Sequence, residues 1–294
     1  MKKANLPQVL RSKTPKVYKN KKLNNANFGD FNHNDYQVFL YLVGKIGGVD
    51  EYGKYLQSEQ LKREYVLTAN EFNKVFNTDL SYCYKIIHKA CKKLMKTSVN
   101  VEKPETSEIW EINVCSMAKY NQNEGSITIE FTDRIMPYLA QVKQRFMLYN
   151  LKEIANFGSL YTTRLYELIQ EFKETGWILK SVEQLREVFA VGQKFKDYKD
   201  FKVKTFGHAC QEINANYDMD LRFEEIKEGR KVAAVKFFFK SVVVNKITDQ
   251  KTGIIRNVYK KPKLQSEKKK KELGLSKISK VLENQLSFKN ITTK

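Results

Sequence analysis

The sequence predicts an α+β fold of two tandem winged-helix domains with basic flexible tails. Three observations lead to this prediction. Apolar periodicities follow the order helix, strand, helix, helix and two-stranded hairpin. That order occurs twice along the chain, and helix-capping residues fall at matching positions in both copies. A duplicated structural unit leaves this kind of trace in a sequence.

A chain of 294 residues is long enough for two domains and two tails. We predict a basic N-terminal tail at 1–33, domain 1 at 34–145, domain 2 at 146–245 and a basic C-terminal tail at 246–294. Most of the net charge of +20 lies in the tails, with eight basic and one acidic side chain in the first and fourteen basic and four acidic in the second. Basic tails attract any polyanion, so the total charge indicates nucleic-acid affinity but not sequence recognition.

The first copy opens with a helix and closes with a wing. Thr68 and Glu71 have the spacing of a capping box, which marks the start of its second helix. A helix over 133–142, interrupted at Pro137, would connect the two copies. The predicted elements are, in order, a helix capped by Asp35, a strand at 65–67, a helix from Thr68 to 75–76, a helix at 81–96, and wing strands at 109–120 and 126–131.

The second copy repeats this order. Ser181 and Gln184 form its capping box. Ser181 precedes Val188 and Phe189 by the same seven and eight positions that separate Thr68 from residues 75 and 76. The predicted elements are an amphipathic helix starting at 160, a strand at 177–179, a helix from Ser181 to Phe189, a third helix at 201–216, and strands at 220–226 and 232–239 joined by a turn at 227–230.

The helix at 81–96 is the first candidate for DNA contact. Its basic residues follow helical spacing opposite an apolar side, and no acid lies within it. Five like charges on one face favour a polyanionic partner, and such a stripe could follow several phosphates. The alternative is a solvated surface face. The predicted contact residues are Lys85, Lys89, Lys92, Lys93 and Lys96.

The third helix of the second copy is the other candidate. The N-terminal part of a recognition helix usually enters the major groove, and acids here dilute the positive potential, so we expect a selective reader of bases. Basic residues in the wing turn could hold the adjacent backbone, or could be ordinary solubilising residues. The candidates are Lys199, Lys202, Lys204, Thr205 and His208 in the helix, and Lys227, Arg230 and Lys231 in the wing.

These residues also resemble a known family. The run from LYTTRLYELIQEF through VEQLREVFAV, DYKDFKVKTFGHACQEIN, LRFEEIKEGRKV and VKFFF is similar to the second winged-helix domain of the plasmid replication initiators that bind iterons, the family of the F-plasmid initiator. The resemblance is strong over 148–239 and, over 35–131, lies more in architecture than in residues. By position, Lys202 and Lys204 match the family's basic residues, whereas Val203, Thr205 and His208 depart from its pattern and suggest a different repeat sequence.

The resemblance implies a set of partners. It implies binding of double-stranded DNA at directly repeated origin sites and at an operator, opening of adjacent AT-rich DNA, and recruitment of the host replication initiator and helicase. It also implies homodimers that repress the protein's own gene, in equilibrium with monomers that activate the origin. On this interpretation domain 1 supplies backbone contacts and dimerisation, and domain 2 does most of the sequence reading.

Enzyme chemistry is not indicated by the residues. His33, His88 and His208 are isolated from one another, so no metal-binding histidine pair is visible, and the four cysteines lack CxxC spacing. We therefore expect no catalytic residue, metal or cofactor. No apolar run approaches the ~20 residues that span a bilayer, so we expect a cytoplasmic protein without membrane contact, and the resemblance implies a bacterial one.

Three alternatives stay open. The same domains could form a transcriptional repressor without initiation activity, or the chain could be a rolling-circle nickase whose site is not recognised. A sequence-neutral RNA binder is disfavoured because no aromatic sheet platform is visible in the sequence.

A short amphipathic helix over 275–286 could dock a host protein or have no partner.

Overall fold

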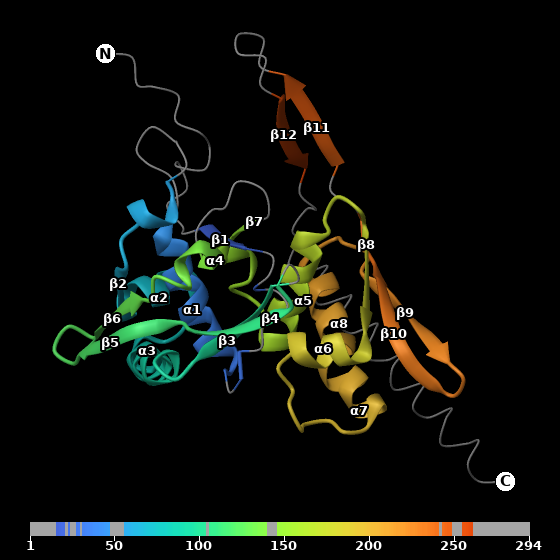
Figure 1. The fold of residues 1–294 in the computed structure, drawn as a ribbon, viewed down its shortest axis with the longest axis horizontal. Coiled ribbons are helices and arrows are strands. Elements are labelled where there is room, and N and C mark those ends of the chain that lie inside the picture. The colour runs from blue at the N-terminus through green and yellow to red at the C-terminus, as the bar shows by residue number, and fades with distance from the viewer. Residues whose placement is uncertain are drawn as a thin grey trace. The chain divides into compact units, whose positions relative to one another are not determined.

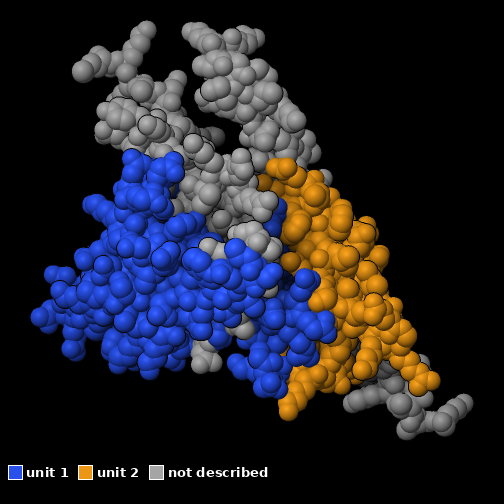
Figure 2. Space-filling model, viewed as in Figure 1, with its two compact units in different colours: residues 1–171, 183–194 blue, residues 172–182, 195–294 orange. Residues whose placement is uncertain are grey.

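The chain forms two compact units in the computed structural model. Unit 1 comprises residues 1–171 and 183–194, and unit 2 comprises residues 172–182 and 195–294 (Figure 2). The structure describes residues 16–20, 23, 28–29, 31–47, 56–103, 106–139, 146–240, 243–248 and 255–260. The helix predicted over 275–286 lies outside them. The predicted boundary between residues 145 and 146 stays a prediction.

Unit 1 contains three antiparallel sheets, with strand orders β1-β7, β2-β6-β5 and β3-β4 (Figure 1). Its elements are β1 (Lys16–Asn20), α1 (His33–Ile46), η3 (Ser58–Gln60), β2 (Glu64–Thr68), α2 (Ala69–Phe76), α3 (Leu80–Leu94), β3 (Ser98–Lys103), β4 (Glu108–Asn113), β5 (Cys115–Asn121), β6 (Ser126–Phe131), α4 (Met136–Leu139), β7 (Phe146–Asn150), η4 (Leu151–Glu153), α5 (Leu160–Glu171) and most of α6 (Val182–Val188).

Local capping chemistry begins the first two long helices of unit 1. Thr68 and Glu71 form the predicted capping box of α2. In α1 the prediction was wrong in one detail, because the N-cap is Asn32 and not Asp35. The Asn32 side chain accepts from the Asp35 backbone at 2.9 Å, and the Asp35 carboxylate accepts from the Asn32 backbone at 2.9 Å. Asp35 therefore serves as the second half of the box.

The predicted wing strand at 109–120 is two strands in different sheets. The chain changes partners at Val114, whose N–H donates to the Thr97 carbonyl at 2.9 Å and whose carbonyl accepts from Thr132 at 3.2 Å. Before this residue β4 pairs with β3, and after it β5 pairs with β6. The single strand was wrong because alternation of side chains does not report a change of pairing partner.

Part of the predicted N-terminal tail belongs to the fold. Strand β1 pairs along its length with β7, and Val17 and Leu23 are buried. These apolar anchors tie the segment to unit 1, so the expectation of flexibility does not hold for residues 16–20. The helix expected over 133–142 is, within its described part, the short α4, with Pro137 in the first turn, where proline is tolerated.

A buried polar cluster holds α5 within unit 1. The guanidinium of Arg164 lies 3.3 Å from the Glu167 carboxylate and donates to the Tyr36 hydroxyl at 2.8 Å. Tyr36 and Tyr149 donate to the same carboxylate at 2.6 and 2.7 Å. Arg164 also donates to backbone carbonyls at Leu23 and Val188. Burial raises the pKa of both tyrosines, so each stays a protonated donor.

Unit 2 has an aromatic core beneath a three-stranded sheet. Phe206 packs edge-on against Phe223 and Phe237 at 5.0 and 5.7 Å, and against Phe201 at 5.7 Å. The antiparallel sheets have the orders β8-β10-β9 and β11-β12. The elements are β8 (Trp177–Ser181), α7 (Tyr198–Lys202), the π-helix η5 (Val203–Gly207), α8 (His208–Asn216), β9 (Arg222–Glu228), β10 (Lys231–Phe238), β11 (Val243–Thr248) and β12 (Ile255–Lys260).

The predicted repeat is visible in the sheets. In β2-β6-β5 and in β8-β10-β9, the second strand of the wing hairpin lies between the first strand and the other wing strand. A short helix follows the first strand in each copy, and the helix preceding the wing is α3 in one and α7–η5–α8 in the other. The fold class of two winged-helix domains is therefore confirmed.

Candidate nucleic-acid interface

Helix α3 carries exposed lysines on the side opposite its buried residues. Its N-cap Asp79 accepts from the Ser81 backbone at 2.8 Å, and the buried side consists of Cys83, Ile87, Ala90, Cys91 and Leu94. Four of the five predicted lysines are exposed, and within the described residues no ion pair involves them. We call these four the α3 stripe; Lys85, Lys89 and Lys92 lie on α3, and Lys96 follows the end of the helix at Leu94.

Lys93 differs from the α3 stripe. Its ammonium lies 2.5 Å from the carboxylate of Asp35, whose side chain is buried in the capping box of α1. The lysine thus neutralises a buried charge and ties α3 to α1. A contact of Lys93 with DNA would compete with this ion pair.

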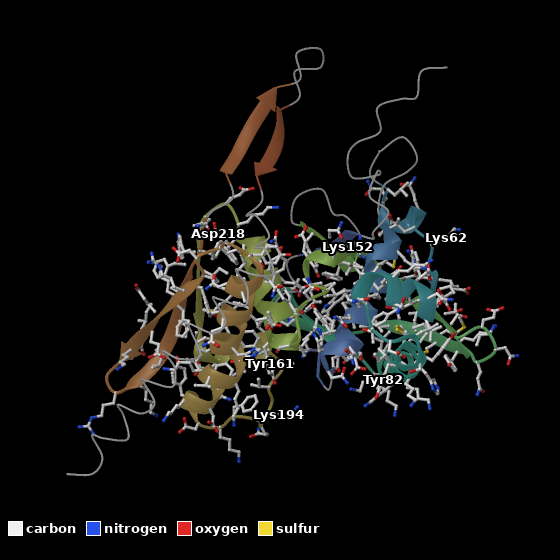
Figure 3. The ribbon with its side chains drawn as sticks, turned by 180° about the vertical axis from the view of Figure 1, so that it is seen from behind. Lys62, Tyr82, Lys152, Tyr161, Lys194 and Asp218 are labelled. Carbon is white, nitrogen blue, oxygen red and sulfur yellow. The ribbon has the colours of Figure 1, made fainter. Side chains whose placement is uncertain are left out.

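Two exposed tyrosines on α3 were not predicted. Tyr82 is 63% exposed at the outer side of the helix (Figure 3), with the Lys85 ammonium 5.8 Å from its ring centre. Tyr84 lies against the wing turn, where Gly125 has a φ of 56° and no space for a Cβ beside the tyrosine ring. The signal for both was available as aromatic residues at polar positions of a lysine-rich helix.

The helix of unit 2 arranges its lysines differently. Lys202 lies 2.9 Å from the Glu225 carboxylate of β9, and the Tyr198 hydroxyl donates to the same oxygen at 3.0 Å. Partial burial raises the pKa of Glu225, but the hydrogen bonds from Lys202 and Tyr198 outweigh it and hold that pKa below its ordinary value. Lys202 is therefore held in place by a charged partner before any ligand binds.

The remaining predicted residues of this helix divide into surface and interior. Lys199 and His208 are exposed, and Lys204 is exposed beside Asp200 at 3.4 Å. Thr205 is 0% exposed, and its hydroxyl donates to the Phe201 carbonyl at 2.6 Å. A contact between Thr205 and DNA would require the helix to open, so the structure does not support that prediction.

The wing of unit 2 ends in a charged turn. Gly229 has a φ of 60°, which the turn between β9 and β10 requires, and the three predicted basic residues are exposed around it. They are Lys227, Arg230 and Lys231. Glu228 is exposed in the same turn, so the wing carries a smaller positive excess than the α3 stripe.

One pair of aromatic side chains lies across neighbouring strands of the sheet of unit 2. Trp177 and Phe238 are opposite each other on β8 and β10, and Trp177 is 47% exposed. The Lys236 ammonium lies 4.9 Å from the Trp177 ring centre and 5.0 Å from that of Phe238, and Arg222 lies over Phe238 at 5.7 Å. Cations therefore already lie over these rings.

The described residues contain four buried cysteines and no cluster of potential metal ligands. The four cysteines are free and buried, and burial raises the pKa of Cys115 to about 12. In the described ranges no group of three or more His, Cys, Asp or Glu side chains could hold a metal ion. Among the same residues, no helix is both long and apolar enough to cross a membrane.

Comparisons with known proteins point to one family. The chain matches the family described as "Initiator Replication protein, WH1" over residues 16–170 and "Initiator Rep protein, WH2" over residues 181–239. The PI protein of Escherichia coli is 26% identical over 147 residues, covering 44% of this chain and 48% of the relative. A replication initiation protein of Escherichia coli is 27% identical over 123 residues, covering 42% of this chain and 35% of the relative. The matches thus span less than half the length of these relatives.

A solved structure has a similar fold. The crystal structure of the Pi initiator protein in complex with iteron DNA matches with a TM-score of 0.62 at 21% identity, covering 78% of this chain and 98% of that one. At this identity the likeness concerns the fold.

Proposed function

The chain belongs to the initiator replication protein family, and from this premise we propose that it is a plasmid replication initiator. It binds directly repeated sites in double-stranded DNA, promotes opening of an adjacent AT-rich stretch and represses its own gene from an operator. No covalent step is part of this function. The protein acts in the bacterial cytoplasm, without membrane contact.

One observation carries the proposal, which is that two helices in the same position of a repeated fold both expose cations. The α3 stripe supplies lysines with no ion-pair partner among the described residues, as contact with successive phosphates requires. Helix α7–η5–α8 supplies lysines that are held by carboxylates, together with other polar side chains, as selection among base edges requires. The fold-related Pi initiator was solved with iteron DNA, a ligand of the class that these two surfaces fit.

Opening of DNA follows from binding energy at several repeats. Bending and untwisting cost least at pyrimidine–purine and AT-rich steps, so strain imposed by adjacent bound copies would concentrate there. Homodimers in equilibrium with monomers, and recruitment of the host replication initiator and helicase, complete the proposal on the basis of the family.

The decisive experiment compares binding and replication by the full chain, since β1 is part of unit 1 and a version starting at residue 34 would lack it. Binding to the direct repeats beside its own gene and to scrambled DNA of equal composition is measured across a salt series. We expect a preference of ~10³-fold or more for the repeats. Equal binding that vanishes with salt would contradict the proposal.

Two further measurements separate the alternatives. A plasmid carrying the repeats and no other origin is introduced into cells with and without the chain. Replication only with the chain is expected, whereas repression of the promoter without replication would identify a repressor. Supercoiled plasmid incubated with the chain and magnesium is expected to stay supercoiled, and nicking would identify the enzyme alternative.

A further inference from the structure

The helix α7–η5–α8 contains one turn of π-helix at its N-terminal half, over Val203–Gly207. Single π turns inside α-helices are uncommon and occur frequently at functional sites, because they change which residues share a face. The part of a recognition helix that enters the major groove is this same N-terminal half.

Two residues of the sequence build this turn. A Cβ added at Gly207 would lie 2.7 Å from the Lys202 carbonyl oxygen, closer than real Cβ atoms come to backbone oxygen, so glycine alone fits without movement. Thr205 is buried, and its hydroxyl donates to the Phe201 carbonyl at 2.6 Å. The residue predicted to touch DNA instead stabilises the turn that positions its neighbours.

The turn leaves an apolar side chain on the outer surface. Val203 is 52% exposed, while Phe201 and Phe206 on either side of it are fully buried. It is the only large apolar side chain exposed on this helix, all of whose residues the structure describes. Its exposed neighbours on the helix surface are polar, and they include Lys199 and Lys204.

Helix stability does not account for this valine. A β-branched residue has a lower helix propensity than lysine, arginine or glutamate, and an exposed side chain gains little from burial. In the major groove the thymine 5-methyl group is the apolar feature among hydrogen-bonding edges, and an apolar side chain of this size contacts it.

We propose that Val203 reads a thymine methyl group in the repeat, and that the π turn formed around Gly207 sets its position. The inference rests on the proposed function and names a specificity contact of the same surface. Lys204 and Lys199 flank Val203 and contact the neighbouring phosphates or guanine edges. Val203 is thus a specificity-determining residue, and Gly207 is a positioning residue that acts through it.

The test removes the methyl group from the DNA and the valine from the protein. DNA bound by the full chain is first selected from a random library, and each thymine of the selected site is then replaced by deoxyuridine, which lacks only the methyl group. For the wild type, affinity is expected to fall about fourfold at one thymine position, the value of one buried methyl-sized group.

The variants identify which residue reads that position. Val203→Ser is expected to bind with equal affinity whether that position holds thymine or uracil, and to keep its preferences elsewhere. Val203→Ile, which keeps the apolar contact, retains the discrimination. Gly207→Ala is expected to lose it without a change in the dependence of affinity on salt, with circular dichroism as a check of folding. Combining Val203→Ser with the replacement of thymine by deoxyuridine completes a double-mutant cycle, which isolates the contact between the valine and the methyl group.

The outcomes are distinguishable. The same deoxyuridine profile for wild type and Val203→Ser would overturn this inference and leave the proposed function intact. Failure of the wild type to select any sequence would overturn the proposed function and the inference with it.

Discussion

Helices α3 and α7–η5–α8 take the same place in the two copies of the fold but hold their charges in opposite ways. The α3 stripe consists of lysines for which the described residues offer no ion-pair partner. In unit 2, Lys202 is paired with Glu225 and Lys204 lies beside Asp200. Lysines without an ion-pair partner suit contacts with phosphates, where positive charge matters more than exact placement. Lysines held by a carboxylate suit contacts with base edges, where exact placement matters more than charge.

The supporting cores differ as well. Unit 1 encloses the ion pair Arg164–Glu167, whereas the core of unit 2 beneath its helix is formed by phenylalanines. Buried charges are costly to leave unpaired, while apolar cores lose stability in proportion to the volume removed. The core of unit 1 should therefore be more sensitive to the loss of one charged partner, and substitutions in both units can test this contrast.

The largest effect is expected for Arg164→Met. It removes the guanidinium beside the buried Glu167 carboxylate, to which Tyr36 and Tyr149 donate, and the free energy of unfolding of unit 1 should fall by about 3–5 kcal/mol. Calorimetry of the full chain measures it. The double variant Arg164→Met/Glu167→Gln, which removes both charges, should recover part of the loss. A loss below about 1 kcal/mol would show that the pair contributes little to the difference between the cores.

A second effect concerns pH and His33 of unit 1. Burial lowers the pKa of His33 to about 4, against the opposing influence of the Phe157 backbone, while the unfolded value is 6.5. Between pH 4 and pH 6.5 the unfolded state binds more protons than the folded state does. The contribution of His33 to the free energy of unfolding is therefore fully present above pH 6.5, and about 3 kcal/mol is lost as the pH drops toward 4. Denaturant unfolding at pH 7 and pH 4.5 measures this loss, which His33→Gln should reduce. An unchanged pH dependence in that variant would assign the acid sensitivity to other groups.

The third effect tests the α3 stripe directly. Replacing Lys85, Lys89 and Lys92 by glutamine should weaken binding to all DNA sequences alike and reduce the slope of log affinity against log salt by about 2.7, or 0.9 for each phosphate that is no longer neutralised. The matched control replaces three exposed lysines elsewhere in unit 1; they are Lys62, Lys74 and Lys152, of which Lys62 and Lys152 are labelled away from Tyr82 in Figure 3. An equal loss in the control would mean that only total charge matters.

The smallest effect is expected at Lys202. Replacement by methionine should relax the preference at one base position by about 1 kcal/mol, the lower end for a base contact, and leave most of the salt dependence. Glu225→Gln, which keeps the lysine but removes its charged partner, is the control for positioning. A uniform loss over all sequences would instead place Lys202 on a phosphate, as for the α3 stripe.

Local signals predicted many of these elements correctly. The Thr68 and Glu71 box begins α2, the strand at 177–179 lies within β8, and the wing strands of unit 2 fall within a few residues of their predicted bounds. Each signal depends on residues close in sequence, such as a cap three positions from its partner or alternation along one strand. Four of the five lysines predicted on α3 are exposed for the same reason.

Long-range pairing could not be predicted in the same way. Lys93 follows the same helical spacing as the α3 stripe, but its ion pair is with a residue 58 positions away. Arg164 and Glu167 fall outside the apolar stripe of their helix, yet α5 is covered by α1 and β7, so both are buried. Neither periodicity nor charge reports which surface a second element will cover.

The order of elements, their repetition and the positions of most exposed lysines can be read from the amino acids alone, because these features follow from interactions within a few residues. Which lysines are free and which are paired depends on the folded chain, since their partners come from distant segments. The fold also turns Thr205 inward and leaves Val203 outside, because a π turn changes the phase of a helix by an amount that regular periodicity does not contain. The proposed difference between a helix that contacts phosphates and a helix that reads bases therefore depends on contacts between segments that are distant in the sequence.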